Sequence, residues 1–138
     1  MSLSQTLTTS FKQQLLQGVH DFDTDTFKVA LYTASADLND TTTAYNVATA
    51  GQVSGTGYTA GGATTTTSVS VTDTTAFVNF SSVVWTAALT ARGALIYNSS
   101  KSNKAVAILD FGADKTSTTT FTVAMPTNSS TSALIRLP

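Results

Sequence analysis

The chain has 138 residues and a formal net charge of -1 at pH 7. Charged residues make up only 11 % of the sequence, less than half the usual share, and much of the polarity comes from 28 threonines and 16 serines. Because no run of lysine or arginine is present, we expect no direct nucleic-acid partner. The absence of cysteine excludes disulfides, thiolate metal sites and cysteine nucleophiles.

The amino terminus lacks the basic region and the apolar stretch of a secretory signal. No segment contains 18 consecutive apolar residues, so we expect no membrane partner. The sequence therefore predicts a chain that is made in the cytosol and stays soluble. Its length fits one β-rich domain over residues 1–138.

Apolar residues near the amino terminus recur at helical spacing. They lie four positions apart, at Leu3, Leu7, Phe11 and Leu15. Gly18 stands where a C-terminal cap would end a helix. The pattern predicts one helix over about 4–17. Its polar face carries Gln and Thr rather than Lys, so we expect the apolar stripe to pack on a sheet or on a neighbouring subunit.

The rest of the chain has the alternation of β-strands. We predict about eight short strands, at 27–33, 67–72, 75–80, 83–85, 94–97, 105–109, 121–125 and 133–137. The strand at 27–33 is expected to be half-buried. The apolar strands at 94–97 and 105–109 are expected to form a hairpin through the turn 98–103. The expected core residues are Trp85, Leu95, Ile96, Val106, Ile108 and Phe121. These features predict an all-β fold, a β-sandwich or jelly roll with one N-terminal helix.

Residues 34–62 contain few large apolar side chains, which predicts an extended loop or arm. Within this segment Gly55 and Gly57 precede Tyr58, and we interpret the group as a glycine-hinged loop with an exposed aromatic anchor. We predict that these three residues and Tyr45 contribute to an interface. Residues 55–60 match the dinucleotide fingerprint in letters only, because no strand ends before them and no helix follows.

The single histidine, His20, lies just past the predicted helix. No Gly-x-Ser-x-Gly pattern supplies a nucleophile for it, and a favourable interaction with the helix dipole explains its position. The run Asp21, Asp23 and Asp25 is similar to the opening of a calcium loop, but the sixth and twelfth positions carry Thr and Tyr instead of Gly and Glu. A polar turn is therefore the favoured interpretation, and we predict no metal site.

Every acidic residue in the chain is an aspartate. Asp110 ends an apolar strand, where we expect it to accept hydrogen bonds from Lys115, from a nearby loop or from Arg92 rather than to act in glycoside hydrolysis. The sequence thus predicts no catalytic residues, no cofactor and no enzymatic activity.

Three segments carry a resemblance to a known family. They read Phe-Lys-Val-Ala-Leu-Tyr at 27–32, Val-Ser-Gly-Thr-Gly-Tyr-Thr-Ala-Gly-Gly at 53–62 and Ala-Arg-Gly-Ala-Leu-Ile-Tyr-Asn at 91–98. Together with the stretches 11–20 and 125–136, they resemble small virion structural proteins of tailed bacteriophages over nearly the whole chain. The resemblance implies a structural role, and its most specific version is a capsid decoration or cement protein.

Such a protein would bind and stabilise the lattice of the major capsid protein on the virion surface, after synthesis in the host cytoplasm. Self-association is also expected, with a dimer favoured because closed dimers are the commonest homo-oligomers, and a trimer as the alternative. Two other classes remain open. One is a tail-associated or fibre-type protein that binds a host surface, and the other is a carbohydrate-binding or hydrolytic module that would stack sugars on Tyr45 and Tyr58.

Overall fold

The structure is a computed structural model that describes residues 3–48 and 50–138. Its described residues form three antiparallel sheets and one α-helix, α1 (Thr9–Leu16), which confirms the predicted all-β fold with one N-terminal helix. The strands are β1 (Thr6–Leu7), β2 (Phe27–Tyr32), β3 (Ala63–Thr65), β4 (Thr67–Thr72), β5 (Thr75–Phe80), β6 (Val83–Trp85), β7 (Thr90–Asn98), β8 (Lys104–Thr116), β9 (Phe121–Val123) and β10 (Arg136–Leu137). Two short 3-10 turns lie at Tyr45–Val47 and Ser99–Lys101.

The largest sheet has five strands in the order β1-β8-β7-β2-β3. Its centre is the hairpin β7–β8, and β2 pairs with β7 from Phe27 opposite Asn98 to Tyr32 opposite Gly93. The expectation that the first strand is half-buried is wrong, because five of the six residues of β2 are buried. Both faces of β2 are covered. One face packs in the principal core of the domain, and the other lies under residues 36–48.

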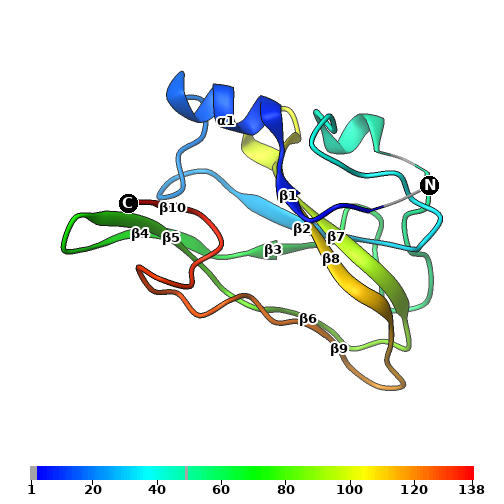
Figure 1. Cartoon of the computed structure of the whole chain (residues 1–138). Helices are drawn as coiled ribbons and strands as arrows, with labels where there is room; N and C mark the ends of the chain where they lie inside the picture. Colours follow the sequence, from blue (N-terminus) through cyan, green and yellow to red (C-terminus); the bar gives the residue numbers. More distant parts are fainter. Residues whose placement is uncertain (1–2, 49) are drawn as a thin grey trace.

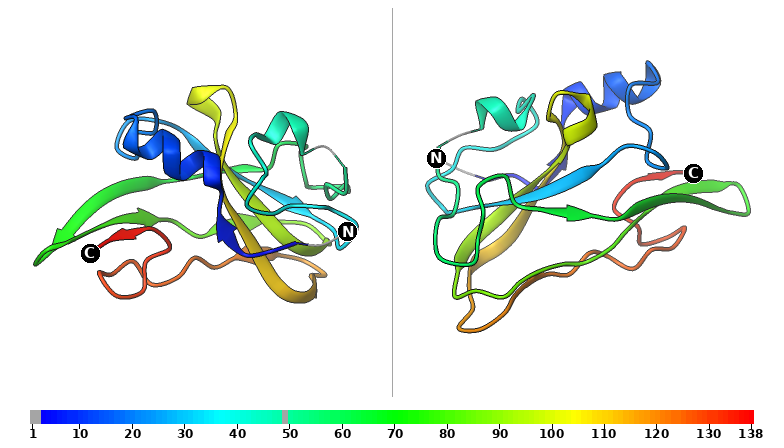
Figure 2. Two further views of the ribbon diagram at one scale, coloured as in Figure 1. Left: turned by 45° about the horizontal axis from the view of Figure 1, so that its top comes forward. Right: turned by 180° about the vertical axis from the view of Figure 1, so that it is seen from behind.

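The second half of the chain forms one long ribbon that folds back on itself. Three strand pairs are nested inside one another along it: β7–β8 innermost, then β6–β9, then β5–β10. This nesting is similar to that of a jelly roll, and it brings β6 and β9 across from the main sheet (Figure 1). The hairpin β4–β5 projects beyond the main sheet with β10 beside it (Figure 2).

The principal core fills the space between the main sheet and the ribbon. It contains Phe27, Val29 and Leu31 from β2, and residues of β5, β6, β7, β8 and β9 close it from the other strands. The predicted core is confirmed. Its members, all buried, are Trp85, Leu95, Ile96, Val106, Ile108 and Phe121.

The helix begins later than predicted, since only Thr9–Leu16 are helical. Thr8 is the N-cap, and its hydroxyl accepts a hydrogen bond from the backbone N–H of Phe11 at 3.2 Å. Residues before it pair with β8 as strand β1, so their backbone is satisfied by the sheet instead of by a helix. Gly18, with φ of 74°, ends the helix as predicted.

Residues 34–62 have mostly irregular backbone, as expected of a loop, but they pack on the domain and do not extend from it as an arm. Ala36, Leu38 and Ala48 lie in a second core cluster with Tyr32 and Tyr97 on the outer face of the main sheet. The Tyr32 hydroxyl donates to the backbone oxygen of Ala48 at 2.6 Å. The segment therefore serves as a cover for that face of the sheet.

Candidate interaction surfaces

Tyr58 lies in the core, so the prediction of an exposed aromatic anchor is wrong. Only 8 % of the residue is exposed. Its hydroxyl oxygen accepts hydrogen bonds from the backbone N–H of Leu31 at 2.9 Å and from the side-chain amide of Gln52 at 2.8 Å. Its ring lies 5.8 Å from that of Trp85. Burial raises the pKa of Tyr58, so the phenol stays neutral and holds the loop to β2.

Gly57, next to Tyr58, allows close packing and does not act as a hinge. Gly57 has φ of 91°, and a Cβ at this position would lie 2.7 Å from the Cβ of Ala87. Gly57 therefore lets the loop lie against the corner between β6 and β7. Since Gly55 and Gly57 are both exposed on the outer side of this loop, their contribution to an interface stays a prediction.

Tyr45, the fourth predicted interface residue, is half-buried. Its ring stacks on Tyr97 with 4.7 Å between the centroids, and its hydroxyl donates to Gln52 at 2.9 Å. The Tyr97 hydroxyl in turn donates to the backbone oxygen of Gly61. The tyrosines of residues 34–62 are thus engaged within the chain, and no aromatic side chain of residues 3–48 and 50–138 is exposed.

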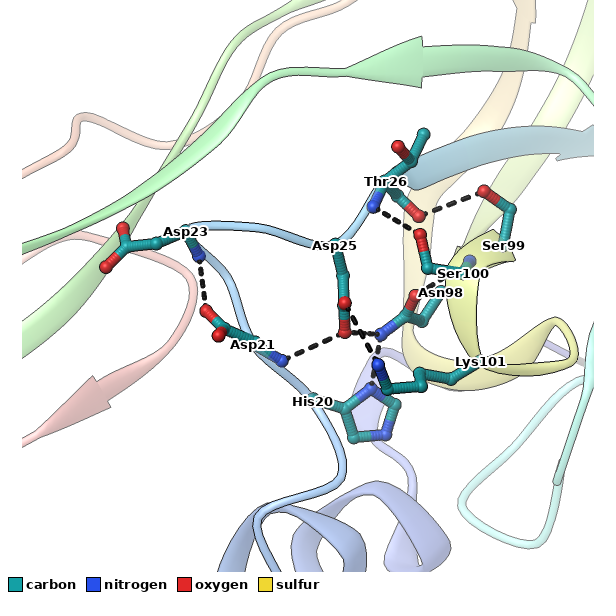
Figure 3. A network of polar contacts seen from close by, with 9 residues as sticks. All are labelled: His20, Asp21, Asp23, Asp25, Thr26, Asn98, Ser99, Ser100 and Lys101. Carbon is teal, nitrogen blue, oxygen red and sulfur yellow. Dashed lines mark hydrogen bonds and ion pairs between the residues drawn. The ribbon is translucent and has the colours of Figure 1, made fainter.

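The acidic run predicted to be a polar turn forms a polar network with residues of the β7–β8 turn (Figure 3). Asp25 lies at its centre and accepts hydrogen bonds from Asn98 at 2.8 Å, from Lys101 at 3.2 Å and from the backbone N–H of Asp21 at 3.1 Å. Burial acts to raise the pKa of Asp25, but these hydrogen bonds outweigh it and lower the pKa below its usual value. The network joins the helix-to-β2 connection to the β7–β8 turn.

His20 belongs to the same network as a neutral side chain. Asn98 accepts a hydrogen bond from Ser100 through its carbonyl oxygen, so its amide group faces His20 and donates to Nδ1 at 3.0 Å. The proton of His20 therefore lies on Nε2, which donates to Gln14 at 2.9 Å. Burial lowers the pKa of His20, although Asp25 acts in the opposite direction. A neutral ring gains little from the helix dipole, so that explanation of its position is corrected.

The two other aspartates of the run satisfy backbone donors. Asp21 accepts from the N–H of Asp23 at 3.0 Å, and Asp23 accepts from the N–H of Val69 on β4 at 2.9 Å. Asp23 therefore covers part of the edge of the β10-β5-β4 sheet. Its carboxylate is engaged in this bond, consistent with the polar turn that the sequence indicates.

Asp110 makes the ion pair that the sequence suggests as one option. Its carboxylate contacts the guanidinium of Arg92 at 3.2 Å and also accepts from the backbone N–H of Gly112 at 2.9 Å. Both side chains are partly exposed. The pair holds the bulge where β7 and β8 lose their register, and its contribution to stability is modest.

Two grooves open on the surface. The larger has a volume of about 430 Å³ and lies between the end of β8 and β9, with Phe111, Phe121 and Leu134 in its wall and Lys115 at its rim. The smaller has about 300 Å³ and lies between the end of α1 and the β10-β5-β4 sheet; its wall includes Leu15, Val69 and Leu137. Neither groove is predicted from the sequence, and the smaller one joins three segments that are distant along the chain.

Exposed apolar side chains gather beside the smaller groove. Val69 and Val71 on β4 are 45 % and 67 % exposed, and Leu137 on β10 is 57 % exposed. Val71 and Leu137 both lie opposite Ala76 of β5, on either side of it. Side chains of directly paired residues project from the same face of a sheet. Val71, Ala76 and Leu137 therefore form an apolar row across the three-stranded sheet.

The described residues contain no buried side-chain polar atom without a hydrogen-bond partner and no cluster of three or more His, Cys, Asp or Glu arranged to hold a metal ion. No helix in this part of the chain is long and apolar enough to span a membrane. Comparison with known proteins gives no match: no family model, no curated protein and no solved structure is significantly similar to the chain.

Proposed function

We propose that this chain is a non-enzymatic structural protein of a bacteriophage particle, and most specifically a capsid decoration protein that binds the lattice of the major capsid protein. The observation that carries the proposal is the contrast between satisfied polar groups inside and apolar groups outside. The polar network around Asp25 is closed within the chain, whereas Val71 and Leu137 remain exposed on one small sheet.

The surface chemistry fits a protein that works by contact. A charge content of 11 % and a net charge of -1 allow many copies to lie close together without strong repulsion. Threonine and serine hydroxyls supply donors and acceptors for polar interfaces. The segments that resemble phage virion proteins occupy β2, the Tyr58 loop and β7, so they build the fold that would present these surfaces.

A tail-associated or fibre-type protein is the second candidate, because the same exposed sheet would suit contact with a host surface. The third candidate, a carbohydrate-binding module, is less well supported by the surface. Sugar binding of that kind uses exposed aromatic rings, whereas among the described residues the least buried aromatic side chains, Tyr45 and Phe111, are half-buried.

Binding to separated parts of the particle tests the proposal. The purified chain is mixed with empty heads that lack tails and, separately, with isolated tails of the phage that encodes it, and each mixture is sedimented. We expect saturable co-sedimentation with the heads at a fixed ratio to the major capsid protein. Binding only to tails would favour the second candidate, and binding to neither would contradict the proposal.

A further inference from the structure

Among the strand edges of the described residues, that of β4 differs from the others. Proteins protect exposed edges by keeping them short, by placing charges on them or by bending them with bulges. Strands β1 and β10 have two residues each, and β3, β6 and β9 have three. The outer half of β8 carries Asp110, Asp114 and Lys115 beside a bulge. Strand β4 has six residues, Thr-Ser-Val-Ser-Val-Thr, without a charge among them.

The open backbone groups of β4 can be assigned from its hydrogen bonds. Ser81 donates to the backbone oxygen of Thr66 at 3.0 Å, so the even-numbered residues face β5. The N–H of Val69 instead donates outward, to Asp23. Because backbone groups alternate in direction along an antiparallel strand, the N–H and C=O of Val71 also point to the free edge. Asp23 covers the first half of this edge, and the half around Val71 stays open.

We infer that a second copy of this chain adds to this edge, with β4 pairing antiparallel to β4 across a two-fold axis. The inference deepens the proposed function and rests on its self-association. A second copy is the occupant because it supplies a matching edge, whose half around Val71 is open and whose strand carries no charged residue. A two-fold contact uses the same residues on both sides, so it joins the two three-stranded sheets into one continuous sheet.

The register centred on Val71 suits this contact. It places Val71 opposite its counterpart and Ser70 opposite Thr72, so that apolar side chains meet on one face and hydroxyls meet on the other. It also leaves the bond from Val69 to Asp23 in place. The apolar row of Val71, Ala76 and Leu137 then continues across the axis into the second copy, which covers surface that is exposed in one chain.

Cysteine cross-linking tests the pairing directly, because the chain has no cysteine of its own. Paired residues across an antiparallel axis lie within disulfide range, about 4.5–5.5 Å between Cα atoms. Under mild oxidation Val71→Cys should give a disulfide-linked dimer, and Ser70→Cys would do so if the register is centred one residue earlier. Val84→Cys is the matched control, since Val84 is similarly exposed, at 54 %, on β6.

A charge introduced at the same position provides the second measurement. Val71→Lys should raise the dimer dissociation constant about tenfold or more in analytical ultracentrifugation, because two like charges would face each other across the axis. Val84→Lys should leave it unchanged. The inference is overturned if neither Ser70→Cys nor Val71→Cys cross-links above the Val84→Cys control, or if Val71→Lys dimerises like the wild type.

The same variants separate this inference from the proposed function. A wild-type chain that is monomeric but binds heads, and loses that binding with Val71→Lys, would show that another protein occupies the edge. That result would overturn pairing with a second copy and leave the structural role intact. If neither the wild type nor any variant binds heads, the proposed function is contradicted. A cross-linked dimer would still support the pairing in that case.

Discussion

The loop 53–62 and strand β4 have similar compositions and opposite environments. Both lack charged residues and are built from small, hydroxyl-bearing or β-branched side chains with few large ones. In the loop, Tyr58 is buried because its hydroxyl reaches Leu31 and Gln52 and because Gly57 allows close packing. On β4, Val69 and Val71 stay exposed, and only β5 pairs with the strand.

The difference shows which of two uncharged segments keeps a surface available for contact. An aromatic residue beside glycines has the appearance of an anchor for a partner, yet here it completes the core of its own domain. The valines of β4 lie on a strand with one open edge and keep exposed side chains, so they are available for contact with another molecule. A strand with one open edge and alternating Val and Ser is therefore the better candidate for an interface in this fold.

Among the substitutions considered for the loop and for β4, truncation of Tyr58 should have the largest effect on stability. Tyr58→Ala should lower the free energy of unfolding by about 3–5 kcal/mol, as for other buried aromatic residues. Tyr58→Phe keeps the ring and should cost about 1–3 kcal/mol, because it leaves the N–H of Leu31 without its acceptor. Denaturant unfolding in dilute solution measures both. A Tyr58→Ala variant as stable as the wild type would place this residue on the surface after all.

Acid should weaken the polar network through His20. Its pKa is lowered on folding, so the unfolded chain binds more protons once the pH falls below the ordinary histidine pKa of 6.5. The stability due to neutral His20 is therefore complete above that pH and is lost as the pH falls, when a protonated Nδ1 can no longer accept from Asn98.

Melting curves between about pH 7.5 and about pH 5 measure this loss, which lies in the range where histidine titrates. The control is His20→Gln, which has no titrating group at this position and should show a smaller fall in melting temperature over the same range. Asp25, Lys101 and Lys104 influence the charge of His20 in both directions. Equal slopes for the variant and the wild type would exclude His20 as the source of the pH dependence.

The smallest expected effect is that of Val71→Ala on the isolated chain. Because the side chain is 67 % exposed, the change in the free energy of unfolding of the monomer should stay within about 0.5 kcal/mol. Unfolding at a concentration where the chain is monomeric provides the measurement. A loss comparable to that of Tyr58→Ala would mean that Val71 covers the core and is not a contact residue.

Much of the sheet can be predicted from sequence where local pattern decides the structure. The strands at 67–72, 75–80 and 83–85 agree with β4, β5 and β6 at both ends, because alternating apolar residues and short turns delimit them. The hairpin around 98–103 is also confirmed. Strand β3 is absent from the predicted strands, since its three residues, Ala63–Thr65, belong to a run of threonines without a distinct pattern.

The errors arise where partners distant in sequence decide the structure. Leu3 and Leu7 have helical spacing, but their segment pairs with Leu38 and with β8, so the helix begins only after Thr8. Residues 34–62 lack strong anchors of their own and are held by Tyr32 and Tyr97 of the sheet below. The same reason applies to the polar network, because Asp25 meets Asn98 and Lys101 only after folding.

Hydrogen exchange followed by mass spectrometry, on the chain alone and on the assembled chain, tests whether β4 or the loop 53–62 is the contact surface. We expect the amides of residues 67–72, Val71 above all, to exchange faster in the dilute chain and to become protected on assembly. The amide of Leu31, bound to the hydroxyl of Tyr58, should exchange slowly in both states. Protection that appears in residues 53–62 on assembly, with residues 67–72 unchanged, would show that the loop and not β4 forms the contact.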